Sequence, residues 1–344
     1  MFPTVLFRSL LGMGLLILFF QGCAQNPVSG RSEVALISAE KEREIGAELA
    51  SQVKEGVGLV EDHELVAYVR AIGSRLAQHS PRRDINYTFN VVDMVEPNAF
   101  ALPGGYVYVS RGLLPLVNSE DELAGVIAHE IAHVAARHAV QRVNVSAITA
   151  PVRIATGITG LATSIVSPRL GQMVAGVGQV ASGLVLAPYS RDQEREADRI
   201  GQELAARAGW DPKGIATFLE TLGREEALRS GEPPRVSFFA THPSTPDRVT
   251  RTTRHATGLT PSLVEPIARD RADLLARLDG LLVGNSPAEG VFFENQFLQP
   301  DLDFTLHFPP KWDTVNAPNL VAAKAPDEDV LVLVQLVGQG DDPF

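Results

Sequence analysis

Helical periodicity organises the chain from residue 38 to residue 78. Ser38 precedes an acidic segment with a helical pattern that runs to about Val53, and an amphipathic segment follows from Asp62 to Gln78. The apolar positions of the second segment recur on one face, at Leu65, Val69, Ile72 and Leu76. The pattern therefore predicts two helices that pack against a core.

Strand-like alternation comes next in the chain. Apolar and polar residues alternate from Ile85 to Asp93, and the run Tyr106–Val109 comes directly after Pro103-Gly104-Gly105, a sequence typical of a turn. We predict a small antiparallel β element over this region.

A strongly apolar helix is predicted from Ser119. Ser119 with Glu122 three positions later has the pattern of a capping box, and the apolar pattern continues to about Arg142. A Gly/Ala/Ile/Val-rich stretch then runs from residue 143 to residue 188, where glycines and Pro168 interrupt it. These interruptions favour buried or lid-like helices over a membrane span, and contact with a membrane stays open.

Further capping and turn signals follow. Ser190 with Gln193 opens a helix that ends near Gly209, and Thr241–Arg248 indicates a loop that enters a basic helix. Residues 257–266 have the character of an interdomain linker. Beyond them we expect one short helix and two strand-like segments in a small β-rich appendage, at residues 269–282, 302–307 and 330–337.

The N-terminus has the layout of a secretory signal. Arg8 precedes an apolar run from Leu10 to Phe20, which is shorter than the roughly 20 residues that a spanning helix needs. Phe20-Gln21-Gly22-Cys23 resembles the bacterial lipoprotein cleavage box, whose cysteine is diacylated. We predict a signal peptide over residues 1–22 and a tether over residues 23–37, lipidated at Cys23. An ordinary signal peptide and an uncleaved anchor are the alternatives.

Composition narrows the classes of function. The net charge of -11 argues against nucleic acid as a partner, and the single cysteine excludes an internal disulfide. The 344 residues leave room for a full domain with an appendage.

The apolar helix that begins after Ser119 carries the candidate chemistry. Histidines four residues apart project from one helix face, so His129 and His133 can place two imidazole nitrogens on one tetrahedral zinc ion. Glu130 is displaced by about 100° around the helix, where it can reach a water on the metal as a general base. His138 lies nine residues from His129, which is half a rotation, so it falls on the opposite helix face and cannot share that ion. A buried histidine pair in a packed helix is the alternative, but it leaves these polar groups without named partners.

A zinc site of this kind needs a third protein ligand. Glu194 lies near the start of the helix capped by Ser190, and Asp198 lies one turn further on the same face, where it can accept a hydrogen bond from a ligand imidazole. Taken alone, this Glu-x-x-x-Asp spacing is common on solvated helix faces.

Four motifs in order resemble one known family. The segments His129–His138 (HEIAHVAARH) and Ser190–Asp198 (SRDQEREAD) are similar to the HtpX-like and CAAX-prenyl-protease metallopeptidases, as are Asn98–Gly105 (NAFALPGG) and Thr241-His242-Pro243. The resemblance covers roughly residues 26–254. It implies a zincin-type fold with Glu194 as third zinc ligand and Asp198 behind a ligand histidine.

The resemblance also implies regulation and setting. Relatives in the exported, periplasmic branch plug the zinc site with a loop histidine, which corresponds to His242, whereas a histidine that merely packs beside Pro243 is the alternative. Arg248 could stabilise an oxyanion, or it could be a solvated charge or a carboxylate partner. The stretch Asn98–Val109 could add an extended substrate along an exposed strand edge, with Asn98, Phe100, Gly104 and Gly105 as candidate residues. A purely structural hairpin is the alternative there.

Together these patterns predict an α+β, mainly helical protein with a zincin-like metallopeptidase domain over residues 38–256 and a linker with a small C-terminal domain over residues 257–344. We expect a periplasmic lipoprotein, anchored in the outer membrane, that binds one zinc ion and cleaves unfolded or misfolded envelope polypeptides. A lipid-anchored chaperone or scaffold with a silent zinc site is the alternative, and a membrane-embedded prenyl-peptide protease is a third possibility.

Overall fold

The computed structural model describes residues 23–25, 28, 30, 32–34, 37–142, 188–228, 238–243, 247–284, 286, 288, 290–317, 320–326 and 330–335. The predicted signal peptide, the Gly/Ala-rich stretch up to residue 187 and Ser244-Thr245-Pro246 lie outside these residues, as does the side chain of Cys23. The backbone at the start of the tether pairs as two short antiparallel strands, β1 (Cys23–Gln25) and β2 (Ser32–Val34), where the sequence predicted only a linker.

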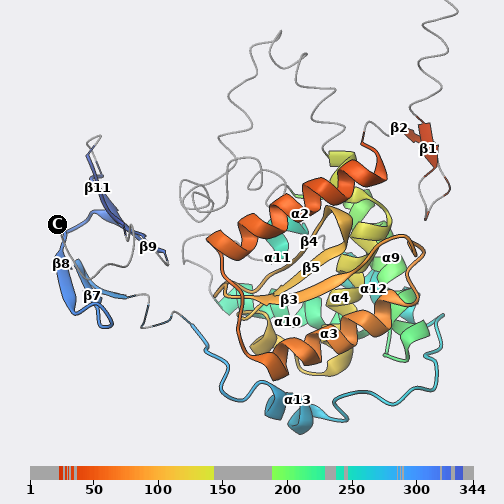
Figure 1. The fold of residues 1–344 in the computed structure, drawn as a ribbon. Coiled ribbons are helices and arrows are strands. Elements are labelled where there is room, and N and C mark those ends of the chain that lie inside the picture. Colours follow the sequence, from red (N-terminus) through yellow and green to blue (C-terminus); the bar gives the residue numbers. More distant parts are fainter. Residues whose placement is uncertain are drawn as a thin grey trace, which may run out of the picture.

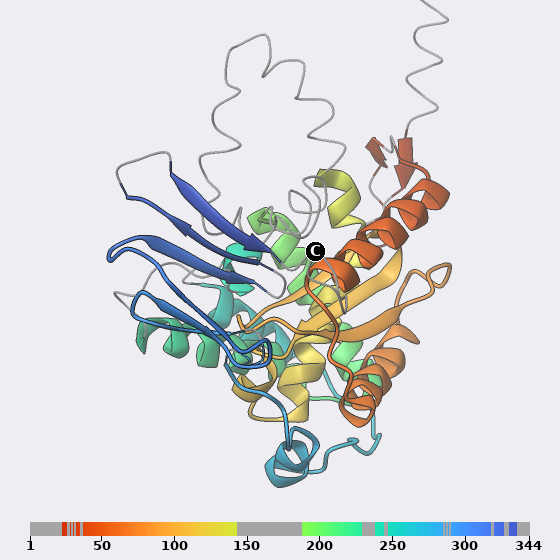
Figure 2. The same cartoon turned by 60° about the vertical axis from the view of Figure 1, so that its left-hand side comes forward.

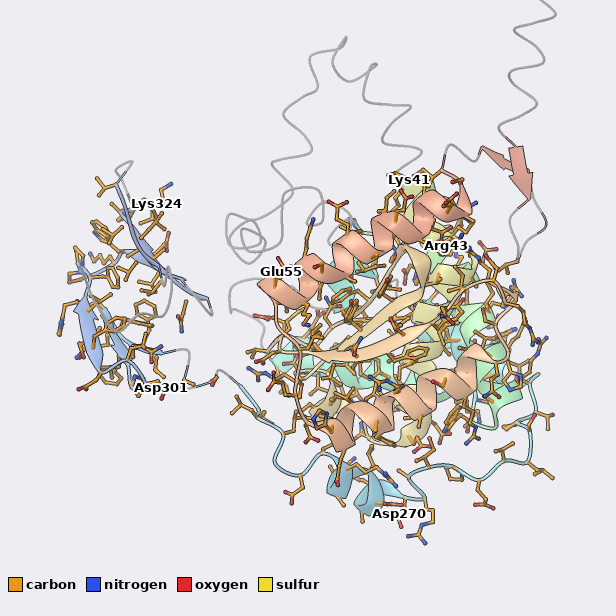
Figure 3. The ribbon with its side chains drawn as sticks, viewed as in Figure 1. Lys41, Arg43, Glu55, Asp270, Asp301 and Lys324 are labelled. Carbon is orange, nitrogen blue, oxygen red and sulfur yellow. The ribbon has the colours of Figure 1, made fainter. Side chains whose placement is uncertain are left out.

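Two helices follow the sequence predictions closely. Helix α2 (Ala39–Gly56) begins at Ser38, whose hydroxyl accepts a hydrogen bond from the Lys41 N–H, and α3 (His63–Ala77) begins at Asp62. Lys41 and Glu55 lie near the two ends of the exposed side of α2 (Figure 3). The starts of both helices could be predicted from the sequence because each N-cap side chain bonds a backbone N–H only two or three residues away.

A three-stranded sheet lies behind α2 (Figure 1), in the order β3-β5-β4. Strand β5 (Tyr106–Ser110) pairs antiparallel with β4 (Ala99–Leu102) but parallel with β3 (Thr88–Val92). The prediction of an all-antiparallel element was therefore wrong for β3. The chain reverses direction between β3 and β4 and reverses again at the 3₁₀ turn η1 (Pro103–Gly105). Strands β3 and β5 therefore run in the same direction.

The sheet is covered on both faces. Phe100, Leu102 and Tyr108 pack with Leu49 and Val53 of α2 in one apolar cluster. The opposite face of the sheet, together with α3, belongs to the main core around helix α4 (Glu120–Ala135). Burial of both faces fixes the strands against α4, which carries the candidate metal ligands.

Helices α9 (Arg191–Ala208) and α10 (Gly214–Leu228) pack on α4 through two close approaches. A Cβ atom at Gly201 would lie 2.9 Å from the backbone nitrogen of His129, and one at Gly214 would lie 2.0 Å from the backbone carbonyl oxygen of Asp121. Glycine at these positions therefore lets α9 and α10 approach the α4 backbone. The capping box of Ser190 and Gln193 and the left-handed C-cap at Gly209 confirm the predicted limits of α9.

Helix α4 ends earlier than predicted. It stops at Ala135, and Arg137 adopts a left-handed conformation with φ of 58° before a new helical segment starts at His138. The Arg137 guanidinium donates to a carboxylate oxygen of Glu42 across 3.0 Å and to the carbonyl of Ile37 across 2.9 Å. These contacts hold the turn although no glycine marks it in the sequence.

The segment beyond residue 256 packs against the main body. Glu120 accepts hydrogen bonds from the backbone N–H groups of Ile267 and Ala268, and Leu274 of α13 (Arg271–Arg277) is fully buried in the core. Asp270, labelled in Figure 3, caps α13. Arg111 donates to the carbonyls of Leu282 and Gly284 across 3.0 and 2.5 Å.

The C-terminal region is β-rich, as the sequence predicted. It contains two three-stranded antiparallel sheets, β6-β7-β8 and β9-β10-β11, which share an apolar cluster that includes Phe297, Phe308 and Val321. Figures 1 and 2 show these strands next to each other, and Figure 1 shows them set to one side of the helical body. In chain order, strands β6 to β11 span Val291–Phe293, Gln296–Gln299, Phe304–His307, Asp313–Ala317, Leu320–Lys324 and Leu331–Gln335.

The expected α+β, mainly helical fold is thus confirmed. Within the described ranges, no helix combines the length and the apolar character needed to cross a bilayer.

Candidate functional site

The two histidines of the HEIAH segment face each other on the last turns of α4. Their Nε2 atoms lie 3.0 Å apart, and both side chains are buried. Glu130, the next residue after His129, is also fully buried. The i, i+4 spacing therefore presents two imidazole nitrogens to one point, as the helix geometry requires.

Glu194 reaches the same point from the first turn of α9. Its Oε1 lies 3.3 Å from His133 Nε2, and its Oε2 lies 3.5 Å from His129 Nε2. With His242, these three residues form a group whose potential ligand atoms all lie within 4.8 Å of one another. The structure thus brings together helices that are more than fifty residues apart in the chain.

His242 lies over the group, directly after the short helix α11 (Phe238–Thr241). Its Nδ1 is 3.2 Å from His129 Nε2 and 3.0 Å from Glu194 Oε1, and its Nε2 is 3.4 Å from Glu130 Oε1. Its ring stacks on Phe238 at 4.3 Å between centroids. His242 therefore contacts both the predicted ligands and the predicted general base.

The donor set fits a divalent metal ion. Both carboxylate oxygens of Glu130 and the Nε2 atom of His242 are buried, with no hydrogen-bond partner in the part of the chain that the structure describes. Buried polar atoms of this kind are costly unless a ligand, ion or water satisfies them. Two imidazoles with one carboxylate form a common catalytic zinc set, which leaves a further position for water.

Burial and neighbouring charges tune the ionisable groups. Burial raises the pKa of Glu130 above the ordinary value of a glutamate. Burial would lower the pKa of His129, but the carboxylates of Glu194 and Asp198 outweigh it and raise that pKa to about 9. The two carboxylates thus stabilise positive charge on the His129 ring or beside it.

Asp198 and Arg248 stand behind His129. Asp198 Oδ1 lies 3.0 Å from His129 Nδ1, the nitrogen that points away from the cluster. Arg248, the first residue of α12 (Arg248–Ala256), pairs with Asp198 and also places its Nη1 2.8 Å from Glu194 Oε2. Among the options for Arg248, this position fits the carboxylate partner, and its burial contradicts a solvated charge.

His138 lies beside His133, and not on the opposite face of the helix as the helical projection predicted. Because α4 ends at Ala135, the chain turns back and His138 Nδ1 lies 2.9 Å from His133 Nδ1. The expectation that His138 faces away from the site was therefore wrong, although His138 does not belong to the four-residue group around His129.

Tyr189 was not singled out from the sequence, yet it forms a wall of the site. Its ring stacks on His133 with centroids 3.7 Å apart, and its centroid lies 5.2 Å from that of His242. A small cavity of about 10 Å³ lies beside it, lined in part by Ala101 and Leu102 of β4. In the sequence, only its position directly before Ser190, the N-cap of α9, could have indicated that Tyr189 lies near Glu194.

The candidate edge residues have different surroundings. Strand β4 does lie at the edge of the sheet, but all four of its residues are buried, so the expected exposed edge was wrong in that respect. Phe100 packs on Tyr108 toward α2, and Gly104 and Gly105 form the turn η1 beneath α2 with φ of 80° and 99°. Asn98 is buried beside β4, and its side-chain amide finds no hydrogen-bond partner among the described residues.

Comparison with known proteins decides the family. Residues 64–256, which include all four members of the group and Glu130, match the profile of peptidase family M48. The chain belongs to peptidase family M48. The match confirms the expected metallopeptidase character but does not single out the HtpX-like or CAAX-prenyl-protease members. The potential ligand atoms of the M48 region have the arrangement of a metal site.

Several M48 relatives carry names that describe their activity. The chain is 31% identical over 242 residues to the beta-barrel assembly-enhancing protease of Escherichia coli (strain K12), covering 70% of this chain and 48% of that protein. It is 30% identical over 237 residues to the mitochondrial metalloendopeptidase OMA1 of Schizosaccharomyces pombe, covering 68% and 66% of the two chains. The Bos taurus metalloendopeptidase OMA1 is 32% identical over 254 residues. The aligned region thus spans about half the length of the bacterial relative.

Proposed function

We propose that this protein is a zinc-dependent endopeptidase that hydrolyses internal bonds of unfolded polypeptides. The observation that carries the proposal is the meeting of His129, His133 and Glu194 at one buried point, with the Glu130 carboxylate beside them. Membership of family M48 and the names of its metalloendopeptidase relatives support it.

The residues of the site have distinct roles in this proposal. His129, His133 and Glu194 would hold one zinc ion, which would supply Lewis-acid polarisation of the scissile carbonyl and of an attacking water. Glu130 takes the proton from that water and returns it to the leaving amine. Its raised pKa and its lack of a hydrogen-bond partner within the described chain suit a carboxylate that must exchange a proton.

Strand β4 is the proposed docking edge for substrate, once movement uncovers its four residues, which are buried in this structure. Asn98 accepts a hydrogen bond from the Ser110 N–H, so by antiparallel alternation the backbone groups of Ala99 and Ala101 point away from β5. An extended peptide could pair with those groups, and the Asn98 amide offers a further contact. Peptides that are N-methylated at single backbone positions should lose cleavage at alternate positions, and uniform cleavage would exclude this docking mode.

His242 is proposed to hold the site in a resting state. It occupies space between the ligand group and Glu130, so a substrate carbonyl could reach the metal only after the segment carrying His242 moves. The Thr241 carbonyl accepts a hydrogen bond from the Tyr189 N–H, which links this segment to the entry of α9.

The setting of the protein is also part of the proposal. Similarity to an assembly-enhancing protease of Escherichia coli supports a role in envelope protein quality control, in the exported branch of the family. We further propose a periplasmic lipoprotein, acylated at Cys23 and anchored in the outer membrane, with a catalytic unit over residues 38–256 that the segment up to Gly284 braces. Replacing residues 1–22 by the signal peptide of a secreted protein without a lipid anchor, together with Cys23→Ala, should release the mature protein from membranes without detergent, and continued membrane association would contradict the anchor.

The decisive experiment uses the mature protein with Glu130→Gln as its matched variant. Wild type should contain one zinc ion per chain and cleave casein, whereas the variant should bind zinc equally and lose about 10²–10⁴-fold in rate. A zinc-loaded wild type that cleaves no unfolded substrate would favour the scaffold alternative. A wild type that binds no zinc would reject the proposal.

A further inference from the structure

His138 faces the back of a proposed zinc ligand. Its ring is fully buried, and its Nδ1 lies 2.9 Å from Nδ1 of His133, the nitrogen opposite the one that points into the ligand group. The left-handed turn at Arg137, held by Glu42, brings the ring to this place.

The second nitrogen of His138 also has a partner. His138 Nε2 lies 3.2 Å from Oε2 of Glu196, which follows Glu194 by two positions on α9. Glu194 and Glu196 therefore approach His133 from opposite sides, one at the ligand nitrogen and the other through His138.

Only one proton arrangement satisfies this chain when His133 Nε2 is a metal ligand. His133 then carries its proton on Nδ1 and donates it to His138 Nδ1, which must be unprotonated to accept. His138 consequently carries its proton on Nε2 and donates it to the Glu196 carboxylate. Each contact in the chain thus has a donor and an acceptor.

The arrangement parallels the one behind the other ligand histidine. Asp198 contacts Nδ1 of His129 directly, whereas Glu196 acts on His133 through an intervening imidazole. Partners of this kind fix the orientation and tautomer of a ligand imidazole and increase its basicity.

We propose that His138, held by Glu196, is a positioning residue that fixes the tautomer and orientation of His133 for metal binding. This inference rests on the proposed zinc peptidase function. Neither residue touches the substrate or the ligand point, so the relay acts through His133 alone.

Zinc affinity of the mature protein, measured by competition with a chromophoric chelator, tests the relay. His138→Phe keeps a ring of similar size but cannot accept the His133 proton, and it should weaken zinc binding by about 10–100-fold. His138→Asn offers an oxygen near the former Nδ1 position and should restore most of that loss. Glu196→Gln keeps an acceptor without its charge and should weaken binding by about tenfold.

Glu203→Gln is the matched control, because it makes the same charge change on α9 at the exposed pair with Arg199. Its zinc affinity should equal that of wild type. The hydrogen bond of the His133 Nδ1–H gives a readout that a purely structural role would not move. In zinc-loaded wild type, nitrogen-15 NMR should show that this Nδ1–H exchanges slowly with solvent; its exchange should stay slow in His138→Asn and become fast in His138→Phe.

The outcomes separate this inference from the proposed function. If wild type binds zinc and His138→Phe binds it equally tightly, the relay is wrong and the peptidase proposal stands. If His138→Phe does not fold, Glu196→Gln decides, and unchanged affinity in that variant overturns the relay. A His133 Nδ1–H that exchanges as fast in zinc-loaded wild type as in zinc-loaded His138→Phe would overturn it as well. A wild type without zinc affinity would remove the function on which the inference rests.

Discussion

The carboxylate of Asp198 and the guanidinium of Arg248 form a two-point ion pair inside the protein. Arg248 Nε donates to Oδ2 across 2.9 Å, and Nη2 donates to Oδ1 across 2.8 Å. Arg248 is 1% exposed and Asp198 is 5% exposed. Because the same carboxylate contacts His129, the pair links α12 to the candidate metal site.

Removing the guanidinium should destabilise the fold strongly. Arg248→Met would leave the buried carboxylate of Asp198 without its cation and remove one of the positive charges beside Glu194, at a cost of about 3–5 kcal/mol in the free energy of unfolding. Arg251→Met on the same helix removes only a part-exposed pair with Asp247 and should cost less than about 1 kcal/mol. Urea unfolding of both variants measures the difference, and equal losses would contradict the account.

Acid should weaken the protein partly through Asp198. Burial alone would raise the pKa of this carboxyl, but Arg248 and His129 outweigh burial and lower it. Its stabilising contribution is therefore present above the unfolded pKa of about 3.9 and is lost as the pH falls through the lower folded pKa. In excess chelator, Asp198→Asn should be less stable at neutral pH but lose less melting temperature between about pH 4 and pH 2. Parallel pH profiles for the two proteins would exclude this contribution.

Glu120 should matter for stability rather than chemistry. Its carboxylate accepts hydrogen bonds from Tyr68 Oη and Trp210 Nε1 across 3.0 and 2.7 Å, and from the backbone of Ile267 and Ala268. Glu120→Ala would strand these buried donors and should lower the free energy of unfolding by at least about 3 kcal/mol.

The control for this prediction is Glu48→Ala, an exposed change on α2 that should stay within about 0.5 kcal/mol of wild type. Chemical denaturation gives both values. A Glu120 variant as stable as the control would show that the segment around Ile267 does not brace the core.

Removal of the His242 ring should raise proteolysis several-fold. His242→Ala frees the space beside Glu130 without changing the three proposed ligands, and casein hydrolysis measures the effect. His255→Ala is a suitable control, because that imidazole bonds Gln202, eight residues after Glu194 on α9, and should leave the rate unchanged. An unchanged or lower rate in His242→Ala would count against the resting-state role.

Local signals in the sequence predicted much of the fold. The caps at Ser38, Asp62 and Ser190 are hydrogen bonds between near neighbours, so residue spacing alone reveals them. The spacing of His129 and His133 likewise follows from one helix. The choice of Glu194 as third ligand needed the family resemblance, because glutamates near helix starts are common on solvated surfaces and their spacing does not indicate metal binding.

Contacts between distant segments could not be predicted in the same way. The end of α4 depends on the contact of Arg137 with Glu42, 95 residues away in the chain. The parallel pairing of β3 with β5 depends on where β4 lies, and residue alternation is the same in parallel and antiparallel strands. The place of His138 follows from the end of α4, which explains why the helical projection misplaced it.

Anomalous X-ray diffraction at the zinc edge, from crystals of the mature protein, tests the central claim most directly. The account predicts one strong peak about 2.0–2.2 Å from Nε2 of His129, Nε2 of His133 and a carboxylate oxygen of Glu194. A crystal of the folded, zinc-supplemented protein with no peak there, or with Glu194 turned away from the ion, would contradict it.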